Sequence, residues 1–395
     1  MNRMHVVIAG AGVAALEAAL ALRSLAEERV TLELVAPDAD LVHRPLAVAE
    51  PFRMGEARRF PLRVFAEATA AALRRDAVVA VDPERKCVTL AGGGEIVYDV
   101  LLVALGARHE DAIVGALTFG GPDDSAALAR LLERVVAGRV KRIVFAVPAA
   151  AAWPLPIYEL ALMTREFVSE HGTRGVDVVV ATPEDRPLGL FGPDASDAVA
   201  ELLSSRDVEL VAGVAARAWQ DGVLVTAGSP IEADAVVALP ALLGPGLRGL
   251  PHDSRGFVPT DDFGRVLEAT DVYAVGDMTQ FPVKQGGIAT QQADTAASAI
   301  AADAGAPVQP TPFEPVLRGL LLTGLTPRYL RSEPGHGRSE IDTEPLWWPP
   351  AKIVGRHLAP FLAARFGLAD AAPSVSDGVE VDIELDRRGH ARFPV

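Results

Sequence analysis

The sequence of 395 residues predicts an α/β fold with two parallel-stranded units, one inserted into the other. Residues 5–36 follow a strand–turn–helix–strand pattern, and a second pattern of this kind begins at residue 142. Parallel strands joined by helices are buried on both faces, and the strands expected here are apolar throughout. Half of the residues are apolar, so the chain can bury two or three domain cores.

The first unit opens with an expected strand at 5–10, a turn at 11–15, a helix at 14–26 and a strand at 31–36. Short apolar runs around the triple-glycine turn at 92–94 predict further strands at 78–81, 87–90, 95–98 and 99–105. The chain returns to this unit with a strand at 272–275 and an alanine-rich helix at 288–304.

Between these segments lies the second unit. A helix at 123–136 precedes two strands, 142–147 and 176–181, which a helix at 156–171 connects. Further strands are expected at 208–211, 223–226 and 235–239. A proline-rich linker at 307–315 leads to a third segment that ends at residue 395.

Charge and cysteine content exclude several classes of function. The 37 basic and 52 acidic side chains give a net charge of −15, which argues against nucleic-acid binding. Cys87 is the sole cysteine, so an intrachain disulfide, a CxxC redox pair and a zinc site of several thiolates are excluded. No histidine pair has metal-ligand spacing, and we expect no metal site. Without a leader pattern or an uninterrupted apolar span, we expect a cytoplasmic protein.

A glycine-rich turn follows the first strand. Residues 8–15, Ile-Ala-Gly-Ala-Gly-Val-Ala-Ala, fit the dinucleotide-binding pattern G-x-G-x-x-G/A. Gly10 allows the tight turn, Gly12 lets the backbone approach a pyrophosphate, and Ala15 lets the helix pack closely on the strand. The helix N-terminus then offers N–H groups to the phosphates. A glycine turn without a ligand is the alternative.

The pattern also calls for an acidic residue about 20 positions further on, which holds the adenosine ribose. The second strand ends instead in Ala36. Glu33 precedes it but points away from the ligand by strand alternation. Asp38 could reach the ribose in its place, or backbone and water could hold it.

A second signature lies at 271–277, Asp-Val-Tyr-Ala-Val-Gly-Asp, an apolar strand that ends in Gly-Asp. Together with the N-terminal G-x-G-x-x-A and the strand end Val-Ala-Leu-Gly-Ala at 103–107, this signature makes the chain resemble a known family. The family is that of the flavoproteins with two dinucleotide-binding domains, the pyridine nucleotide-disulfide oxidoreductase-like proteins. The chain is most similar to the sulfide:quinone oxidoreductases, flavocytochrome c sulfide dehydrogenases and type II NADH dehydrogenases.

The resemblance covers about residues 4–304 and implies a domain organisation. An FAD-binding Rossmann-like domain would comprise residues 1–115 and 255–306. A second Rossmann-like domain of the NAD(P)-binding type would occupy residues 116–254. Residues 307–395 would form a small C-terminal interface segment like the one that builds the quinone port in these families.

The resemblance also implies FAD contacts. Asp277 would accept hydrogen bonds from ribitol or phosphate hydroxyls, unless it is a turn carboxylate that caps the next element. Residues 285–287 would lie at the pyrimidine edge of the flavin, where N–H groups stabilise the charge of the reduced ring. Val78 would contact adenine through its backbone. The full set is Gly10, Gly12, Ala15, Asp38, Arg44, Pro45, Val78, Gly106, Gly276, Asp277, Gln285, Gly286 and Gly287.

The second unit departs from the NAD(P)H-using members of these families. Their G-x-G-x-x-G-x-E motif aligns with residues 152–159, where Ala152, Pro154 and Ile157 occupy the glycine positions. A β-branched residue and a proline hinder the approach of a pyrophosphate, and proline lacks an N–H. Sulfide dehydrogenases share a Pro-x-Tyr-Glu segment here, but they need redox cysteines. Cys87 is expected to be a packed thiol, so their thiol chemistry does not transfer.

The C-terminal segment carries paired tryptophans, Trp347 and Trp348, before an expected helix at 351–366. In one interpretation, the apolar face of this helix packs on the first domain or in a homodimer interface. The other makes it a peripheral anchor on the inner face of the membrane and a quinone port. Glu159 is expected to be a helix-start carboxylate, with a proton shuttle as the alternative.

Three functions remain open. The first is an FAD-dependent oxidoreductase that passes electrons from NAD(P)H to a quinone or another small acceptor. The second takes electrons from sulfide or another small-molecule donor without cysteine chemistry. The third is a flavin-binding redox sensor or complex subunit without catalysis. In all three the expected cofactor is FAD, and NAD(P) is a candidate for the second domain.

Overall fold

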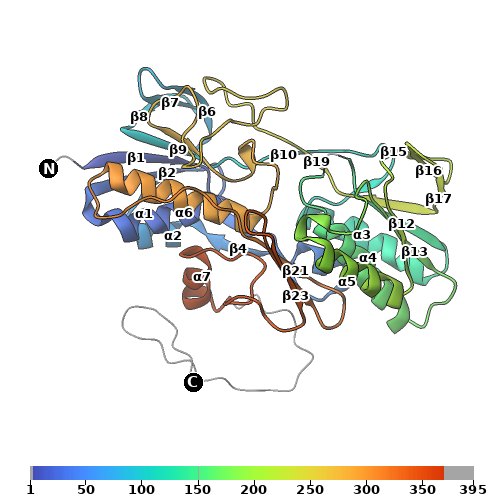
Figure 1. Cartoon of the computed structure of the whole chain (residues 1–395). Coiled ribbons are helices and arrows are strands. Elements are labelled where there is room, and N and C mark those ends of the chain that lie inside the picture. The colour runs from blue at the N-terminus through green and yellow to red at the C-terminus, as the bar shows by residue number, and fades with distance from the viewer. Residues whose placement is uncertain (1–2, 150, 369–395) are drawn as a thin grey trace, which may run out of the picture.

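The computed structural model of the chain describes residues 3–149 and 151–368, arranged as two α/β lobes with the C-terminal strands between them (Figure 1). The first lobe is built on a five-stranded parallel sheet in the order β20-β9-β1-β2-β5. Its strands are β1 (Met4–Ala9), β2 (Val30–Val35), β5 (Ala72–Arg74), β9 (Val100–Val103) and β20 (Val272–Ala274). The strand expected at 272–275 thus rejoins the N-terminal unit, as the sequence predicts.

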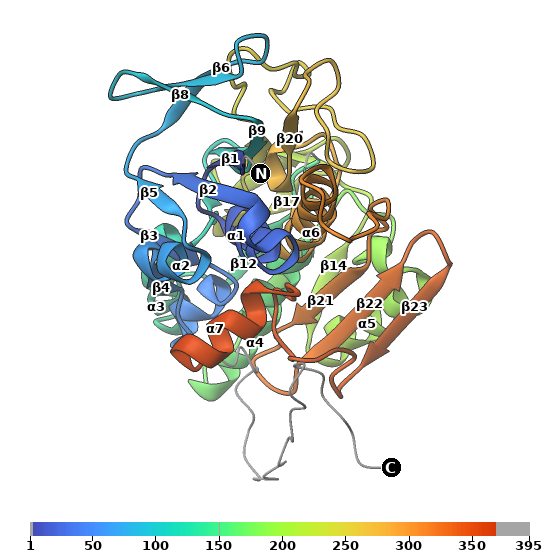
Figure 2. The ribbon, with the colours of Figure 1, turned by 90° about the vertical axis from the view of Figure 1, so that its left-hand side faces the viewer.

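Helices α1 (Val13–Ala26) and α6 (Gly286–Asp303) lie side by side on one face of this sheet (Figure 2). The helices meet largely through alanines, whose small side chains allow close packing. The other face is covered by the antiparallel strands β6 (Val78–Asp82), β7 (Cys87–Leu90) and β8 (Glu95–Val97). The expected α/β fold is therefore confirmed for this lobe.

The second lobe repeats the plan with a parallel sheet in the order β11-β18-β12-β13-β14. Its strands are β11 (Leu117–Thr118), β12 (Arg142–Ala146), β13 (Asp177–Ala181), β14 (Val208–Val211) and β18 (Ala235–Ala238). One face packs on α3 (Ser125–Val136), α4 (Leu155–Glu170) and α5 (Pro193–Ser205), and the other on β15 (Ala216–Gln220), β16 (Val223–Thr226) and β17 (Ile231–Glu232).

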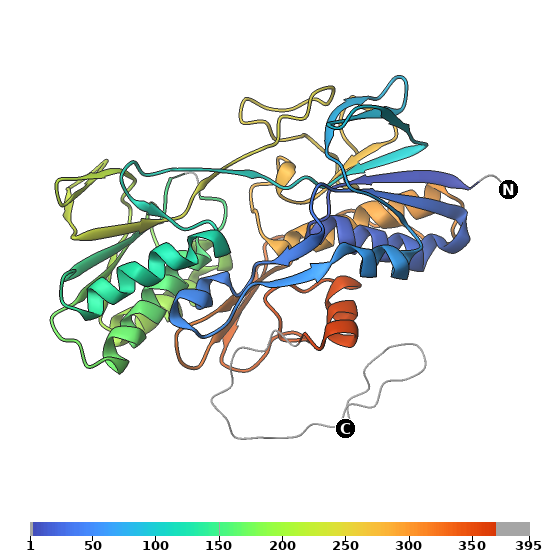
Figure 3. The same ribbon diagram turned by 180° about the vertical axis from the view of Figure 1, so that it is seen from behind.

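Two antiparallel strands, β10 (Arg108–Glu110) and β19 (Ala241–Leu243), carry the chain between the lobes (Figure 3). The first lobe also reaches the second through η2 (Ala47–Phe52), which contacts α3 and α4. The helix η2 lies between the paired strands β3 (Asp40–His43) and β4 (Arg58–Pro61), and α2 (Leu62–Thr69) then returns to α1. Single-turn helices are η1 (Glu27–Arg29), η3 (Pro122–Asp124), η4 (Gly189–Phe191) and η5 (Gly276–Met278).

The C-terminal segment contains an antiparallel sheet that the sequence analysis did not anticipate. Its strands are β21 (Leu317–Leu321), β22 (Arg328–Glu333) and β23 (Arg338–Asp342). The prediction of a helix at 351–366 is wrong for its first half, since α7 spans only Leu358–Phe366. The carbonyls of Ala351 and Val354 instead accept hydrogen bonds from the Trp347 indole and the Thr290 hydroxyl.

Helix α7 packs on the first lobe. Leu358 and Leu362 are buried, while Phe361 contacts Phe65 with 5.0 Å between ring centroids. Phe366 contacts Phe60 at 4.7 Å. The interpretation of this helix as part of the first-domain core is therefore confirmed. Trp348 is 59% exposed, and no described helix is both long and apolar enough to span a membrane.

A buried carboxylate on α1 fixes the start of α7. Glu17 is fully buried, and its two oxygens accept the backbone N–H groups of His357 and Leu358, each at 2.7 Å. These N–H groups have no partner within α7, so Glu17 acts as a cap supplied from another helix. Asp294 of α6 lies beside it, and burial together with the Glu17 charge raises the pKa of Asp294 to about 8.

A second buried carboxylate fixes the segment before α7. Glu159 on α4 is fully buried and accepts two hydrogen bonds from Lys352 Nζ, at 2.6 and 2.8 Å. Its Oε1 also accepts the N–H of Leu322, the residue after β21. Glu159 is the fifth residue of α4, so the expectation of a helix-start carboxylate is wrong. It joins the second lobe to two parts of the C-terminal segment.

We predict that Asp294→Asn removes a pH-dependent loss of stability. The unfolded Asp294 loses its proton near its ordinary pKa of 3.8, whereas the folded one keeps it up to about pH 8. The folded state then binds more protons, so stability falls as the pH rises through this window. The variant should equal the wild type near pH 4 and exceed it by at least about 1 kcal/mol at pH 8 in urea unfolding. A constant difference across this range would contradict the prediction.

We predict that Lys352→Met destabilises the protein at pH 7 by about 3 kcal/mol, because it leaves the Glu159 carboxylate buried without its counter-charge. Adding Glu159→Gln should recover most of this loss, and so should lowering the pH, since burial already raises the pKa of Glu159. Unfolding midpoints measure both effects. Lys141→Met, at an exposed lysine, is the matched control and should change little. Equal midpoints for Lys352→Met and Lys141→Met would rule out a structural role for the pair.

Candidate functional site

A cavity of about 650 Å³ opens where the carboxyl ends of β1, β9 and β20 meet. Ligands of parallel α/β sheets bind at this edge. The cavity continues past the N-termini of α1 and α6 to the start of α4, to β21 and to the segment before α7. Its wall includes eleven of the predicted residues, which are Gly10, Gly12, Asp38, Arg44, Pro45, Val78, Gly106, Gly276, Asp277, Gln285 and Gly286.

The glycine turn has the shape that the sequence predicts. Gly10 adopts φ +113°, and a Cβ there would lie 2.3 Å from the carbonyl oxygen of Ala104, so only glycine fits. Gly12 is the N-cap residue of α1, with no side-chain cap on the helix. A Cβ at Gly12 would touch none of the described residues within 4 Å, which leaves the first N–H groups of α1 open to the cavity.

Two predicted residues lie behind the wall of the cavity, as far as the described chain shows it. Ala15 is fully buried in the core under α1, so its small size serves helix packing. The N–H of Gly287, expected to face the ligand, donates instead to Gln285 Oε1 at 2.8 Å. The Gly287 N–H is therefore not free for a ligand, because the side chain two residues earlier accepts its hydrogen bond.

Gln285 caps α6 and leaves its other polar atom unused. Its Oε1 holds the Gly287 N–H, whereas its Nε2 is buried without a hydrogen-bond partner in the described part of the chain. A buried unpaired amide donor costs about 1–3 kcal/mol. Because Gln285 lines the cavity, a carbonyl or ring nitrogen of a bound ligand would remove that cost.

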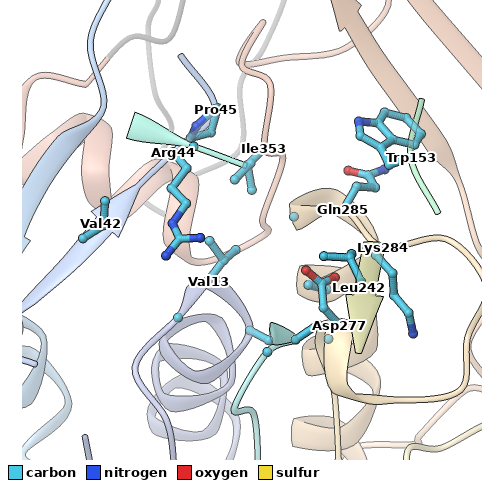
Figure 4. A pocket seen from close by; sticks show the side chains of 18 of the residues that line it. Val13, Val42, Arg44, Pro45, Trp153, Leu242, Asp277, Lys284, Gln285 and Ile353 are labelled. Atoms are coloured by element: carbon cyan, nitrogen blue, oxygen red, sulfur yellow. The ribbon is translucent and has the colours of Figure 1, made fainter. Parts of the chain in front are cut away.

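Asp277 and Arg44 lie on opposite sides of the cavity (Figure 4). The Asp277 carboxylate is directed into the cavity. Burial raises its pKa while the positive charges of Lys284 and Arg44 lower it, and no residue among 3–149 and 151–368 forms a hydrogen bond with it. Asp277 is therefore a free acceptor at the wall rather than a turn cap, which suits a ligand hydroxyl.

Lys284 lies beside Asp277, with its ammonium directed away from that carboxylate (Figure 4). The Nζ donates to the Thr279 carbonyl and lies 4.2 Å from the Phe257 ring centroid. Burial lowers the pKa of Lys284 to about 8. Its charge therefore acts at the cavity wall while its donors are largely used by the protein.

Of the two acidic candidates for the ribose, only Asp38 belongs to the described cavity wall. Asp38 lines the cavity, next to the end of β2. Glu33 points away, as alternation predicts, and pairs with Arg74 at 2.7 Å and with His5 at 3.4 Å.

Cys87 is buried on β7 outside the described cavity wall, and burial raises the pKa of its thiol. No group of three His, Cys, Asp or Glu among the described residues could hold a metal ion.

The second lobe meets the cavity through the loop before α4 rather than through a glycine turn. Pro154 is the N-cap residue of α4, and Pro156 lies in its first turn, so two of the N–H groups that would bind a phosphate do not exist. The Trp153 side chain lines the cavity and packs against Phe191 with 5.7 Å between ring centroids. This loop therefore offers the cavity an aromatic surface instead of the backbone N–H groups of a phosphate site.

Sequence reasoning missed several wall residues, namely Trp153, Lys284, Arg318, Lys352 and Ile353. For the two lysines the sequence did contain a signal, which is the rarity of lysine in this chain. Of its four lysines, Lys284 and Lys352 line this cavity. The others come from segments that only the tertiary structure brings to the site. Ile353, for example, lies against Gly286, where a Cβ would come within 2.5 Å of its side chain.

Comparison with known proteins agrees with this arrangement. The family model described as pyridine nucleotide-disulphide oxidoreductase matches residues 4–145 and 158–301. The interval between the two matched ranges, 146–157, contains the loop that lacks the glycines. In structure, the chain is similar to the sulfide:quinone oxidoreductase of Aquifex aeolicus, with a TM-score of 0.77 and 18% identity over 86% of this chain and 87% of that one.

Two curated relatives show similarity in sequence. Rhodocoxin reductase of Rhodococcus erythropolis is 27% identical over 298 residues, 71% of this chain and 66% of the relative. Sulfide-quinone reductase of Aquifex aeolicus is 25% identical over 223 residues, 54% of this chain and 52% of the relative. The chain thus matches about two thirds of the first relative and about half of the second. With the family match over most of its length and the paired α/β lobes, the chain belongs to the pyridine nucleotide-disulphide oxidoreductase family.

Proposed function

We propose that the chain is an FAD-dependent oxidoreductase that passes electrons from a reductant to a quinone or another small acceptor. The observation that carries this proposal is one continuous cavity, which starts at the glycine turn of α1 and ends between the lobes and the C-terminal segment. One end suits a dinucleotide pyrophosphate and the other suits a redox-active ring with a substrate beside it.

The residues present fit FAD. Gly12 leaves room for a pyrophosphate at the open N-terminus of α1, and Asp38 and Val78 lie where the adenosine would extend. The unpaired Asp277 carboxylate can accept a ribitol hydroxyl. The buried Nε2 of Gln285 and the N-terminus of α6 can donate to carbonyls of the flavin ring. When bound, FAD would supply two-electron oxidation and reduction.

Glu159 and Lys352 are the acid–base pair of this cavity. Both line it, both are nearly inaccessible to solvent, and Lys352 holds the Glu159 carboxylate in a fixed position. Burial raises the pKa of Glu159, so its Oε atoms can hold a proton under conditions where an exposed glutamate is ionised. We infer that Glu159 holds and releases a proton for the acceptor, with Lys352 stabilising the ionised form.

The donor has two candidates. NAD(P)H follows from the family, which is named for pyridine nucleotides. The loop before α4 favours a small reductant instead, because Trp153, Pro154 and Pro156 replace the surface on which a second pyrophosphate would rest. A small donor needs only the cavity between the lobes.

We predict that Gly12→Val weakens FAD binding at least tenfold while the protein still folds. The N-cap backbone is extended, which valine adopts readily, and its side chain would enter the space assigned to the pyrophosphate. Flavin fluorescence titration of the apoprotein measures the affinity, and circular dichroism checks the fold. Gly189→Val is the control, since that exposed glycine also has free space around it among the described residues. Normal FAD affinity in Gly12→Val would contradict the assigned pyrophosphate position.

The donor is tested by anaerobic bleaching of the flavin. At equal concentrations, we expect sulfide or a comparable small reductant to bleach the flavin faster than NADH or NADPH. Rapid bleaching by a nicotinamide would instead identify NAD(P)H as the donor despite the missing glycines. Cys87→Ala should leave the bleaching rate unchanged, because Cys87 lies outside the described cavity wall. A protein that neither contains nor takes up FAD would disprove the proposed function itself.

A further inference from the structure

The residues that line the far end of the cavity include an arginine that forms no hydrogen bond or ion pair with a described residue. Arg318 projects from β21 and lines the cavity together with Leu320, Lys352 and Ile353. It has no hydrogen-bond or ion-pair partner anywhere in residues 3–149 and 151–368, and its Nε is buried without one. Arginine keeps its proton in proteins, so the positive charge persists in this half-buried position.

The strand register makes this charge more costly. Arg318 lies directly opposite Arg331 in the antiparallel pair of β21 and β22. Like charges opposite one another destabilise a sheet. Burial and the neighbouring Arg331 lower the pKa of Arg318, and the charge of Glu333 offsets only part of this effect. Arg331 is compensated by Glu333 at 2.5 Å and lies opposite Glu340 of β23. Arg318 is the member of this pair left for a ligand.

The neighbouring charges at this end of the cavity are already used. Lys352 is held by both oxygens of Glu159, so neither its charge nor that carboxylate is free to pair with Arg318. The rest of this wall, including Leu320 and Ile353, is apolar. The site therefore combines an apolar surface with one unpaired cation, in a chain whose net charge is −15.

We propose that this end of the cavity takes an acceptor that carries an anionic group, a carboxylate or a sulfonate, on an apolar ring, and that Arg318 binds this group. This inference rests on the proposed function, because it names the substrate class of the same site. A guanidinium pairs with such oxyanions through two parallel hydrogen bonds, and a partly desolvated site strengthens the pairing. Arg318 would thus set specificity for acidic over neutral acceptors.

The binding test uses FAD-loaded protein and two redox-inert ligands of equal shape, naphthalene-2-sulfonate and the neutral naphthalene-2-sulfonamide. In calorimetric titrations, we expect the sulfonate to bind the wild type at least tenfold more tightly than the sulfonamide. Arg318→Gln should abolish that preference, and Arg318→Lys should keep part of it. Arg328→Gln, on the same sheet but outside the described cavity wall, should leave it intact. Equal affinities for the two ligands, or an unchanged preference in Arg318→Gln, would overturn the inference.

The kinetic test follows reoxidation of the photoreduced flavin by 1,4-naphthoquinone and its 2-sulfonate. Each quinone takes up two electrons from the reduced cofactor and two protons, one of them delivered by Glu159, which is reprotonated from water, and leaves as the hydroquinone. Arg318→Gln should raise KM for the sulfonate at least tenfold, with kcat and the neutral quinone unaffected. A similar change for both quinones, or none for either, would assign Arg318 no role in specificity. If neither quinone reoxidises the wild type, the proposed acceptor class fails, and the binding test still decides the role of Arg318.

Discussion

The buried ion pair between Glu159 and Lys352 is the interaction on which the shape of the site depends. Glu159 belongs to the second lobe, Lys352 to the segment before α7, and the N–H of Leu322, on the same carboxylate, to the C-terminal sheet. A buried pair of this kind adds little net stability compared with apolar packing, but it is very costly to break on one side. It therefore fixes one arrangement of the three parts around the cavity, and Ile353 is held against Gly286 as a result.

The opposite end of the cavity is fixed by backbone packing rather than by charge. Gly10 lies so close to the Ala104 carbonyl that no Cβ fits, and Gly276 lies between Ala14 of α1 and Ala289 of α6. These small residues bring the starts of both helices to the same edge of the sheet. Uncapped N–H groups and the unpaired atoms of Asp277 and Gln285 then face one space. Rigid packing thus prepares a polar surface whose groups the protein itself leaves unsatisfied.

The sequence predicts most of what local patterns control. The apolar strands, the glycine turn and the return of strand β20 to the first sheet follow from periodicity and motif spacing. The β21–β23 sheet does not, because its strands, LRGLL, RYLRSE and RSEID, show no regular alternation of apolar and polar residues and lie in a segment without a motif. The role of Glu159 could not be predicted from the sequence for another reason, since its partner Lys352 lies 193 positions further along the chain. The hydrogen bond from the Gly287 N–H to the Gln285 side chain could not be predicted either, because it is visible only in three dimensions.

The distribution of charge indicates that this cavity binds a ligand and is not an incidental gap in the packing. In a chain of net charge −15, Arg44, Lys284, Arg318 and Lys352 all line one cavity. Lys352 is paired with Glu159, and Lys284 is held by a carbonyl and an aromatic ring, so their charges are partly compensated within the protein. Arg318 has no hydrogen-bond or ion-pair partner among the described residues, only the longer-range attraction of Glu333, and its strand neighbour is another arginine. A fold retains such a charge at a cost in stability. A bound anion would offset that cost, which is why a neutral acceptor alone does not explain this wall.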